Sequence, residues 1–268
     1  MENNCVVIVS SCDIYSDAWK PFFTLFFRYW PDCPYSIYLI SNYKEYGDSR
    51  VIPIRVGEDK KWATNMKVAL ETVECSHVIY LQEDYFLQSR VDTEYVKKLV
   101  YYAERNNVSC LRLFPSPSPD IFFENSLNLG KISENAAYRV SLQAALWRSQ
   151  DLKDLICEGE SGWDMEYNGT LRSIGKDLFL GVNNPVLNYL TSTGIIKGKW
   201  TVEAVKLCKK EGIEIDLSRR AINYKTNYRA ILDRTRKHSW ARRIRRIPLI
   251  GKIVSKIFWK SCRLLGLN

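Results

Sequence analysis

An acidic pair, Glu83 and Asp84, interrupts an apolar segment of the sequence, VIYLQEDYFL at residues 78–87. An apolar run of this kind predicts a buried strand, and parallel α/β sheets bind their ligands at the carboxyl ends of strands. Carboxylate oxygens at such an end can bind Mg²⁺ or Mn²⁺, and these cations can also bind a diphosphate. The pair therefore indicates a site for a diphosphate-bearing ligand, the alternative being two solvated acids at a strand end.

A second group of acids surrounds Trp163 in the segment ESGWDMEYNGT, residues 160–170. It contains Glu160, Asp164 and Glu166. One of these acids could serve as a general base, because apolar walls raise the pKa of a carboxyl group toward the working pH, and the indole could stack on a sugar ring. The alternative is that Trp163 belongs to the core and that the acids cap the next helix.

A cationic loop is expected in the segment GIIKGKW, residues 194–200, where Lys197 and Lys199 flank a glycine. Such a loop could close on a diphosphate and neutralise the charge of a leaving group. The alternative is an ordinary surface turn.

The elements that must position these residues alternate along the chain. Apolar runs predict strands, and segments with an apolar face predict helices, which together give a mostly parallel sheet with helices on both faces. Residues 138–156 begin as a strand and become a helix near Ser149, whose hydroxyl is expected to be the N-cap. Residues 120–135 fit either an acceptor-binding flap or a surface loop. In chain order the predicted strands are 5–12, 35–41, 51–56, the apolar run from 78 that ends at Glu83 and Asp84, and 109–115, and the predicted helices are 17–30, 62–73 and 92–105.

Composition narrows the class of protein. With 268 residues and 46% hydrophobic residues, the chain can build a substantial core. Its eight cysteines form no CxxC pair and only two histidines are present, which argues against a structural zinc site or a disulfide scaffold. The first residues resemble no signal peptide, and no apolar run approaches the roughly 20 residues that span a bilayer. We expect a cytoplasmic protein with reduced thiols.

The positive charge is concentrated at the C-terminus. Of 39 basic residues, eleven lie in residues 234–268, which contain no Asp or Glu, so the net charge of +9 belongs to this tail. Ile250, Ile253 and Ile257 recur at helical spacing beside a cationic face. We therefore expect a globular domain over 1–233 and, at 234–268, a basic amphipathic tail. Its residues 240–268 would bind the anionic inner leaflet of a membrane. A helix docked on the body is the alternative; a nucleic-acid arm would not need the isoleucine periodicity, so no nucleic-acid partner is expected.

Taken in order, these motifs carry a resemblance. The apolar first strand, the Trp/Asn/Lys-bearing helix at 62–67, LQEDYF, SLQAALW, SGWDMEYNG and GIIKGKW resemble a GT-A-type glycosyltransferase of the bacterial kind that builds capsule, O-antigen or lipooligosaccharide, over residues 5–220. The resemblance implies a GT-A-like, Rossmann-like sheet flanked by helices. It places Asp84, with Glu83 beside it, as the last acid of a DxD-type motif that faces metal and diphosphate. Because Gln82 stands where the first Asp would be, dependence on Mn²⁺ or Mg²⁺ stays open. The other residues that it implicates in nucleotide-sugar binding are Ser11, Asp13, Asn65, Lys67, Lys197 and Lys199.

The same resemblance assigns the acceptor side. Asp164 and Glu166 both fit the catalytic base of an inverting enzyme. Asp164 is preferred, with Glu166 binding an acceptor hydroxyl or holding the loop. Gln143 and Trp163 are expected to bind the acceptor. The implied reaction moves a sugar from a nucleoside-diphosphate sugar, most often a UDP-sugar, to a hydroxyl of a growing glycan on a polyprenyl diphosphate. The enzyme would act as a peripheral protein on the inner face of the cell membrane.

Two other classes of protein fit part of the pattern. A sugar nucleotidyltransferase would also use acids at strand ends, but it usually needs a glycine-rich phosphate loop, and VVIVSSCDIYSDAW contains no glycine. A peripheral membrane adaptor without catalysis would need only the tail. A serine hydrolase is disfavoured because the sequence has no GxSxG motif.

Overall fold

The computed structural model describes residues 4–176 and 178–224. The predicted tail, 234–268, lies outside the described residues, as does its predicted membrane-binding part, 240–268. The boundary at residue 233 therefore stays a prediction. Within the described residues, no helix is both long and apolar enough to cross a membrane.

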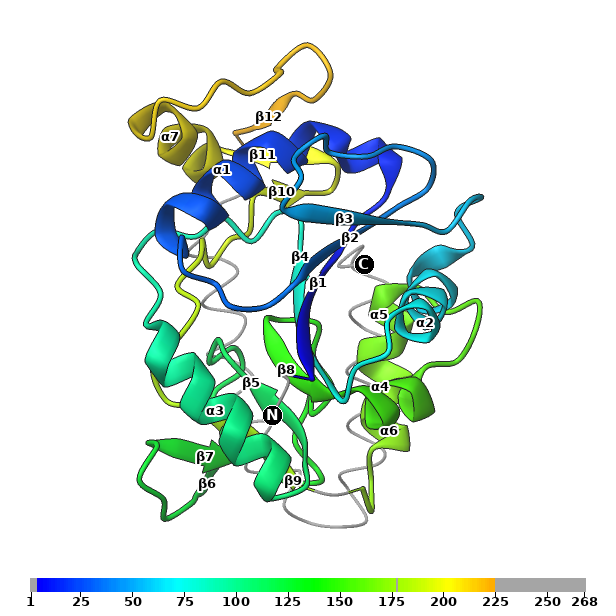
Figure 1. The fold of residues 1–268 in the computed structure, drawn as a ribbon, viewed down its shortest axis with the longest axis vertical. Helices are drawn as coiled ribbons and strands as arrows, with labels where there is room; N and C mark the ends of the chain where they lie inside the picture. The colour runs from blue at the N-terminus through cyan, green and yellow to red at the C-terminus, as the bar shows by residue number, and fades with distance from the viewer. Residues whose placement is uncertain (1–3, 177, 225–268) are drawn as a thin grey trace.

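A nine-stranded mixed sheet organises the described part of the chain, in the order β3-β2-β1-β4-β8-β5-β9-β7-β6 (Figure 1). β3, β2, β1 and β4 run parallel, β8 is antiparallel between β4 and β5, and β5 pairs in parallel with β9. The predicted mostly parallel, Rossmann-like sheet is thus confirmed. Its strands are β1 Cys5–Ser10, β2 Ile37–Ser41, β3 Val51–Arg55, β4 His77–Gln82, β5 Val108–Arg112, β6 Ile121–Phe122, β7 Leu129–Lys131, β8 Ala145–Arg148 and β9 Leu178–Val182.

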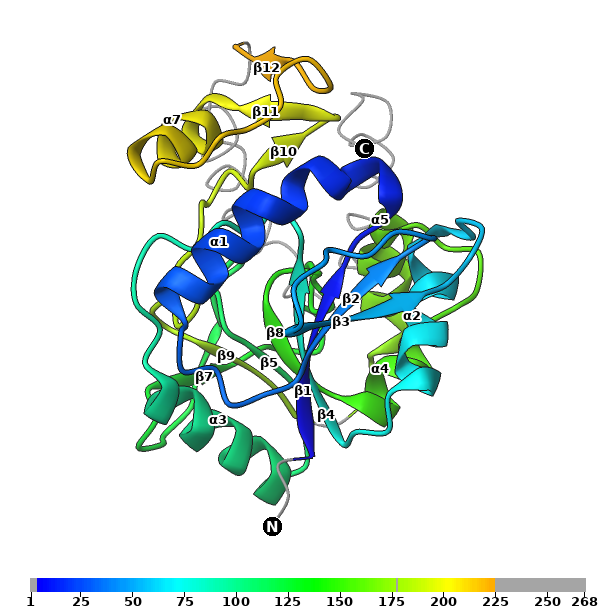
Figure 2. The same cartoon turned by 45° about the horizontal axis from the view of Figure 1, so that its top comes forward.

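Helices cover both faces of this sheet, as predicted (Figure 2). Alternate residues of β1 point to opposite layers: Val7 and Val9 pack with α1, α3 and α7, whereas Val6 and Ile8 pack with α2 and α4. The helical segments are the 3₁₀ helix η1 Asp13–Ala18, α1 Trp19–Tyr29, α2 Lys61–Thr72, α3 Thr93–Arg105, α4 Ser149–Leu155, α5 Gly162–Asp164, the π-helical turn η2 Met165–Gly169, α6 Thr170–Arg172 and α7 Val202–Lys210.

β4 ends at Gln82, as the two acids predict, because the chain turns at Glu83 and Asp84. Two local expectations need correction. Ser149 is not an N-cap: it is the first residue of α4, and its buried hydroxyl lies 3.4 Å from the Sγ of Cys75. The strand expected from residue 138 is confined to β8 and runs antiparallel to its neighbours.

A small second sheet stands beside η1 and α1 (Figure 2). Its strands are β10 Ile195–Ile196, β11 Lys199–Thr201 and β12 Ile222–Asn223. β10 and β11 form a hairpin whose two turn residues, Lys197 and Gly198, have φ of 51° and 72°. Left-handed residues at both positions suit the right-handed twist of a two-residue hairpin. The predicted cationic loop is therefore an ordered β-hairpin.

Candidate functional site

The acidic pair lies at the carboxyl end of β4, where the sequence places it. Glu83 and Asp84 are both buried. The backbone N–H of Ile195 donates to Oδ2 of Asp84 at 3.1 Å, and the N–H of Gly194 donates to the Asp84 carbonyl at 2.8 Å. A Cβ at Gly194 would lie 2.9 Å from the Phe86 ring, so glycine permits this close approach. The motifs LQEDYF and GIIKGKW therefore meet through backbone contacts to Asp84.

Burial makes the charge of this pair costly. It raises the pKa of Glu83 well above its usual range, and the nearby Asp84 carboxylate raises it further, while Arg220 opposes the shift. Burial also raises the pKa of Asp84 to about 6, against the stabilising N–H of Ile195. Two acids so placed attract a cation, because a nearby positive charge favours their ionised forms.

The pair also fits part of a metal site. Its carboxylate oxygens are the ligands that Mg²⁺ and Mn²⁺ prefer. Among the described residues, no group of three or more His, Cys, Asp or Glu side chains is arranged to hold a metal ion. A cation at Asp84 would therefore take its remaining ligands from a bound phosphate and from water. The residues fit a cation shared with a ligand better than one enclosed by protein.

The hairpin brings two lysines to the same part of the molecule. Lys197 and Lys199 are both exposed, one at the turn and one at the start of β11. Their hairpin is the one whose first residues bond to Asp84. The predicted cationic and acidic groups thus belong to one connected unit.

The neighbouring ends of β1 and β4 are held by side chains. β4 pairs with β1 up to Gln82. The Gln82 amide donates to the Tyr80 hydroxyl at 2.9 Å, and the Trp62 indole donates to the same hydroxyl at 3.0 Å. Ser11, just after β1, accepts a hydrogen bond of 2.8 Å from the Trp19 indole. The side chain of Gln82 is therefore hydrogen-bonded within the protein.

Asp13 joins the ends of two strands. Its carboxylate accepts the backbone N–H groups of Asn42 at 3.0 Å, Tyr43 at 3.2 Å and Lys44 at 3.3 Å. The Asn42 side chain accepts the N–H of Asp13 and donates to the carbonyl of Gly57, after β3. These bonds fix the loops after β1, β2 and β3. These hydrogen bonds do not test the predicted role of Asp13 in nucleotide binding, which stays a prediction.

The two predicted nucleotide-binding residues of α2 differ in setting. Asn65 is buried, accepts the N–H of Lys60 at 3.2 Å and donates to Asp59 at 2.8 Å, so it orders the loop before the helix. Lys67 forms a 2.6 Å ion pair with Glu158 on the surface. None of these bonds of Asn65 and Lys67 involves Glu83 or Asp84.

Glu166 is connected to the acidic pair by a short chain of bonds. Its Oε1 accepts the N–H of Leu142 at 2.7 Å and the Ser141 hydroxyl at 3.3 Å. The carbonyl of Leu142 accepts the hydroxyl of Tyr85, the residue after Asp84, at 2.6 Å. Burial raises the pKa of Glu166, while the N–H of Leu142 opposes the shift. A buried carboxyl with a raised pKa is suited to proton transfer near neutral pH.

Asp164 has a different position although it is two residues away. Its Oδ2 accepts the N–H and the hydroxyl of Ser161 at 3.1 and 2.7 Å, and its N–H donates to the Ser161 hydroxyl, which completes a capping box. Glu160 pairs with Arg172 at 2.6 Å. Trp163 is 58% exposed, so the interpretation of it as a core residue is wrong. The alternative that an acid here caps the next helix does describe the contacts of Asp164.

Gln143, the other predicted acceptor-binding residue, lies beside an aromatic stack. Its Oε1 accepts the hydroxyl of Tyr189 at 2.7 Å. The Tyr189 ring stacks on Tyr85 with centroids 4.4 Å apart and on Phe114 at 4.3 Å. Gln143 is half-buried and is thus joined to the same Tyr85 that follows Asp84.

Sequence reasoning missed Arg220. This buried side chain forms a bidentate ion pair with Asp17 of η1. The only sequence signal is an Arg-Arg step after the short segment EIDLS. Such a step usually belongs to a solvated surface, so its burial could not be foreseen.

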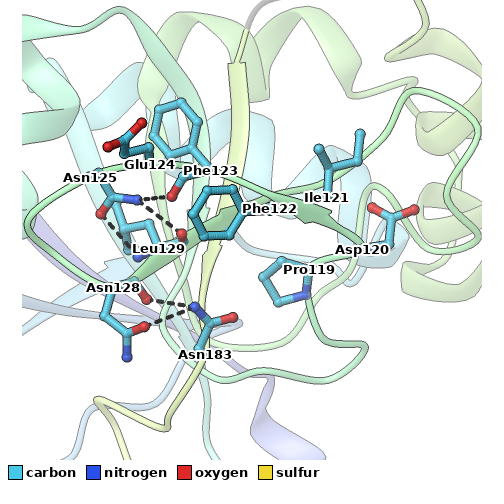
Figure 3. A pocket seen from close by; sticks show the side chains of 11 residues that line it. Pro119, Asp120, Ile121, Phe122, Phe123, Glu124, Asn125, Asn128, Leu129 and Asn183 are labelled. Carbon is cyan, nitrogen blue, oxygen red and sulfur yellow. Dashed lines mark hydrogen bonds between the residues drawn. The ribbon is translucent and has the colours of Figure 1, made fainter.

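The segment 120–135 forms the β6–β7 hairpin at the free edge of the sheet (Figure 3). A surface cavity of about 360 Å³ lies there, and Phe122 beside it is 88% exposed. None of the predicted site residues lines this cavity. Its lining consists of Pro119, Asp120, Ile121, Phe122, Phe123, Glu124, Asn125, Asn128, Leu129, Gly130 and Asn183.

Comparison with known proteins yields similarity in structure only. No family model matches the sequence, and no curated protein matches it. Solved structures with a similar arrangement include S. aureus TarS 1-349 in complex with UDP, with a TM-score of 0.44, 12% identity, and coverage of 66% of this chain and 60% of that one.

Two further structures are similar at the same level. The mannosyltransferase PcManGT from Pyrobaculum calidifontis, in complex with GDP-Man and Mn²⁺, has a TM-score of 0.48 and 12% identity, with coverage of 73% of this chain and 58% of that one. A cytidylyltransferase from Leptospira borgpetersenii serovar Hardjo-bovis has a TM-score of 0.37 and 10% identity, with coverage of 78% and 95%. This chain thus spans about 60% of the length of TarS 1-349 and of PcManGT. Likeness at this level concerns the α/β architecture alone.

Proposed function

We propose that this protein is an inverting glycosyltransferase that moves a sugar from a nucleoside-diphosphate sugar, with UDP as the nucleotide, to a hydroxyl of a glycan. The observation that carries the proposal is the buried pair Glu83 and Asp84 at the end of β4, bonded to the hairpin that bears Lys197 and Lys199. A departing diphosphate needs positive charge beside it. This unit provides lysines and a place for a cation.

The two acids by themselves would repel a diphosphate. Negative charge on both sides is tolerated only if a cation lies between them or if the acids are protonated. A divalent ion at Asp84 would supply that charge when it is bound, and the exposed lysines of the hairpin would supply more. The combination therefore suits an anionic leaving group better than it suits an uncharged ligand.

The contacts of the two acceptor-side acids support Glu166 as the general base. Its pKa is raised by burial, and it is bonded to Leu142, which also contacts Tyr85. Asp164, which the sequence alone favours, uses one carboxylate oxygen to cap the helix that carries Trp163 and Glu166. In this assignment Asp164 positions that helix, and the base removes the proton from an acceptor hydroxyl that attacks the anomeric carbon.

The acceptor and the site of action rest on sequence features. The exposed indole of Trp163 offers a face for a sugar ring. The basic amphipathic residues 240–268 would hold the protein on the anionic inner leaflet, where a polyprenyl-diphosphate-linked glycan is confined. Confinement of both to one surface raises their effective concentration. We therefore propose a lipid-linked surface glycan as the acceptor.

Nucleotide binding tests this function directly. Thermal shift and calorimetry would be measured with UDP, GDP, CMP and dTDP, each with and without Mn²⁺, because a ligand of the folded state raises its apparent stability. We expect a selective shift with UDP that Mn²⁺ increases, and we expect Asp84→Asn to weaken UDP binding by about tenfold or more, the loss of one charged contact.

The control for this substitution is Asp154→Asn, which removes an exposed acid of α4 that pairs with Lys176. It should bind UDP as the wild type does. Absence of binding by all four nucleotides, or full UDP affinity in Asp84→Asn, would contradict the proposal.

A further inference from the structure

A buried ion pair joins the C-terminal part of the described chain to η1. The Nε and Nη2 atoms of Arg220 donate to the two carboxylate oxygens of Asp17 at 2.9 and 3.0 Å. Their side chains are only 8% and 2% exposed. Both charges are therefore removed from water, and each depends on the other.

The same guanidinium also holds the turn of the cationic hairpin. Its Nη1 donates to the carbonyl of Gly198 at 2.8 Å, and its Nη2 donates to the carbonyl of Ile14 at 3.0 Å. Arg220 thus connects three segments that are distant in sequence: η1, the hairpin turn, and its own segment before β12. A lysine could not reproduce these contacts, because the planar fork of donors is specific to arginine.

The hairpin is short and is held at several points. Its strands β10 and β11 have two and three residues, and β11 also pairs with β12. Asp84 binds the hairpin where it begins, at Gly194 and Ile195. Arg220 binds it at the opposite end, at Gly198. Lys197 lies between these two anchored positions in the sequence, and Lys199 directly follows the second.

Arg220 is also close to the acidic pair. Its guanidinium lies 4.7 Å from the centre of the Tyr15 ring. Tyr15 is in turn within electrostatic range of both Glu83 and Asp84. Arg220 and Asp17 are themselves within electrostatic range of Glu83, so the ion pair lies near the acids as well as being bonded to the hairpin turn.

We propose that Arg220 is a positioning residue, which fixes the hairpin Ile195–Thr201 so that Lys197 and Lys199 meet the diphosphate of the donor. This inference rests on the proposed function and adds a residue to it. Arg220 touches no substrate in this role; it acts through the hairpin. A purely structural ion pair would hold the fold equally well but would have no selective effect on diphosphate binding.

The test compares ligands that differ only in phosphate. Dissociation constants of UDP and uridine would be measured for the wild type and for Arg220→Lys, which keeps the charge and loses the fork. We expect about tenfold weaker UDP binding and unchanged uridine binding, because only the diphosphate meets the lysines. Equal weakening of both ligands, or no change in either, would overturn the inference.

A matched control is Arg28→Lys. Arg28 also joins α1 to the C-terminal part of the described chain, through Glu211 at 2.6 Å, and its hydrogen bonds go to Glu211 rather than to the hairpin. UDP affinity should not change in this variant. Loss of UDP binding in Arg28→Lys as large as in Arg220→Lys would show that any weakened attachment of this part has the same effect.

A second background keeps the test decisive. In Lys197→Gln/Lys199→Gln, adding Arg220→Lys should weaken UDP binding no further, because the groups through which Arg220 acts are absent. An additive loss would overturn the inference.

If Arg220→Lys does not fold, Arg220→Gln combined with Asp17→Asn removes both buried charges and is measured in the same way. If the wild type binds no nucleotide, the proposed function fails first; if it binds UDP and Arg220→Lys binds it equally, only this inference fails.

Discussion

Two pairs of acids that look alike in the sequence have different environments in the structure. Glu83 and Asp84 follow a strand, share one turn, and are both buried beside the cationic hairpin. Asp164 and Glu166 lie on one helical segment, yet one caps the helix and the other is buried against Leu142. Adjacent acids in a turn can act together, whereas acids two apart on a helix face different sides.

This difference has a chemical consequence. Burial and mutual proximity disfavour the two negative charges of the pair at β4, so either protonation or a nearby cation would stabilise the pair. The helical pair has no such joint demand, since its members contact different groups. In the proposed function, one pair would therefore bind a diphosphate and its cation, and the other would divide into a base and a helix cap.

The strongest test of this division replaces each helical acid separately. Glu166→Gln should lower kcat by about a thousandfold, the usual contribution of a general base, and leave UDP affinity unchanged. Asp164→Asn should keep kcat within about tenfold of the wild type, because a positioning residue is absent from the reacting atoms. Turnover of a UDP-sugar and UDP calorimetry measure both effects.

A reversed result would restore the assignment that the sequence favours. If Asp164→Asn loses turnover and Glu166→Gln keeps it, Asp164 is the base and Glu166 holds Leu142. If both variants keep full activity, neither acid is the base and the mechanism is wrong. Melting temperatures of both variants at one pH separate these outcomes from loss of fold.

The sequence was sufficient for the elements and for part of the site. Apolar runs and helical spacing located β1 to β5 and α1 to α3, and the end of β4 followed from the charges at Glu83 and Asp84. The bond between Asp84 and Ile195 spans 111 residues, and no local pattern encodes it. Their proximity was suggested only by a resemblance. The burial of Arg220 depends equally on tertiary contacts.

The failures share a physical cause. Ser149 has the right residue type for an N-cap, but the N-cap position of α4 is occupied by Arg148. The backbone N–H of Ser149 donates instead to the carbonyl of Ser76. The short hairpin formed by β6 and β7 has no strong periodicity, since strands of two and three residues carry too few side chains to show one. Local sequence preference determines neither the start of α4 nor the β6–β7 hairpin. Both depend on pairing with other segments of the chain.

A second test uses pH to separate the pairs. Burial and Asp84 raise the pKa of Glu83 in the folded protein, so the folded state binds a proton there more tightly than the unfolded state does. This contribution to stability is fully present below the unfolded pKa of about 4.3 and is lost as pH rises through the folded value. Glu83→Gln removes that loss, and we expect it to melt a few degrees above the wild type at pH 8.

The difference in melting temperature between Glu83→Gln and the wild type should shrink as pH falls, because the raised pKa favours the protonated form of Glu83 in the folded protein. Glu94→Gln, a change at an exposed acid of α3 that pairs with Lys97, provides the control and should show no such dependence. A variant less stable than the wild type at pH 8 would mean that the Glu83 carboxylate stabilises the fold, contrary to its burial.

The smallest expected effect concerns the helix cap. Ser161→Ala removes the hydroxyl that donates to Asp164 and accepts its N–H, so the free energy of unfolding should fall by about 1 kcal/mol, the usual cost of a lost N-cap. UDP affinity should not change, because the acidic pair and its hairpin are untouched, and kcat should fall only slightly. Urea unfolding and turnover measure these quantities. A loss of kcat as large as that of Glu166→Gln, without loss of stability, would mean that the Ser161–Asp164 pair takes part in proton transfer. The two helical acids would then share the role that we propose for Glu166 alone.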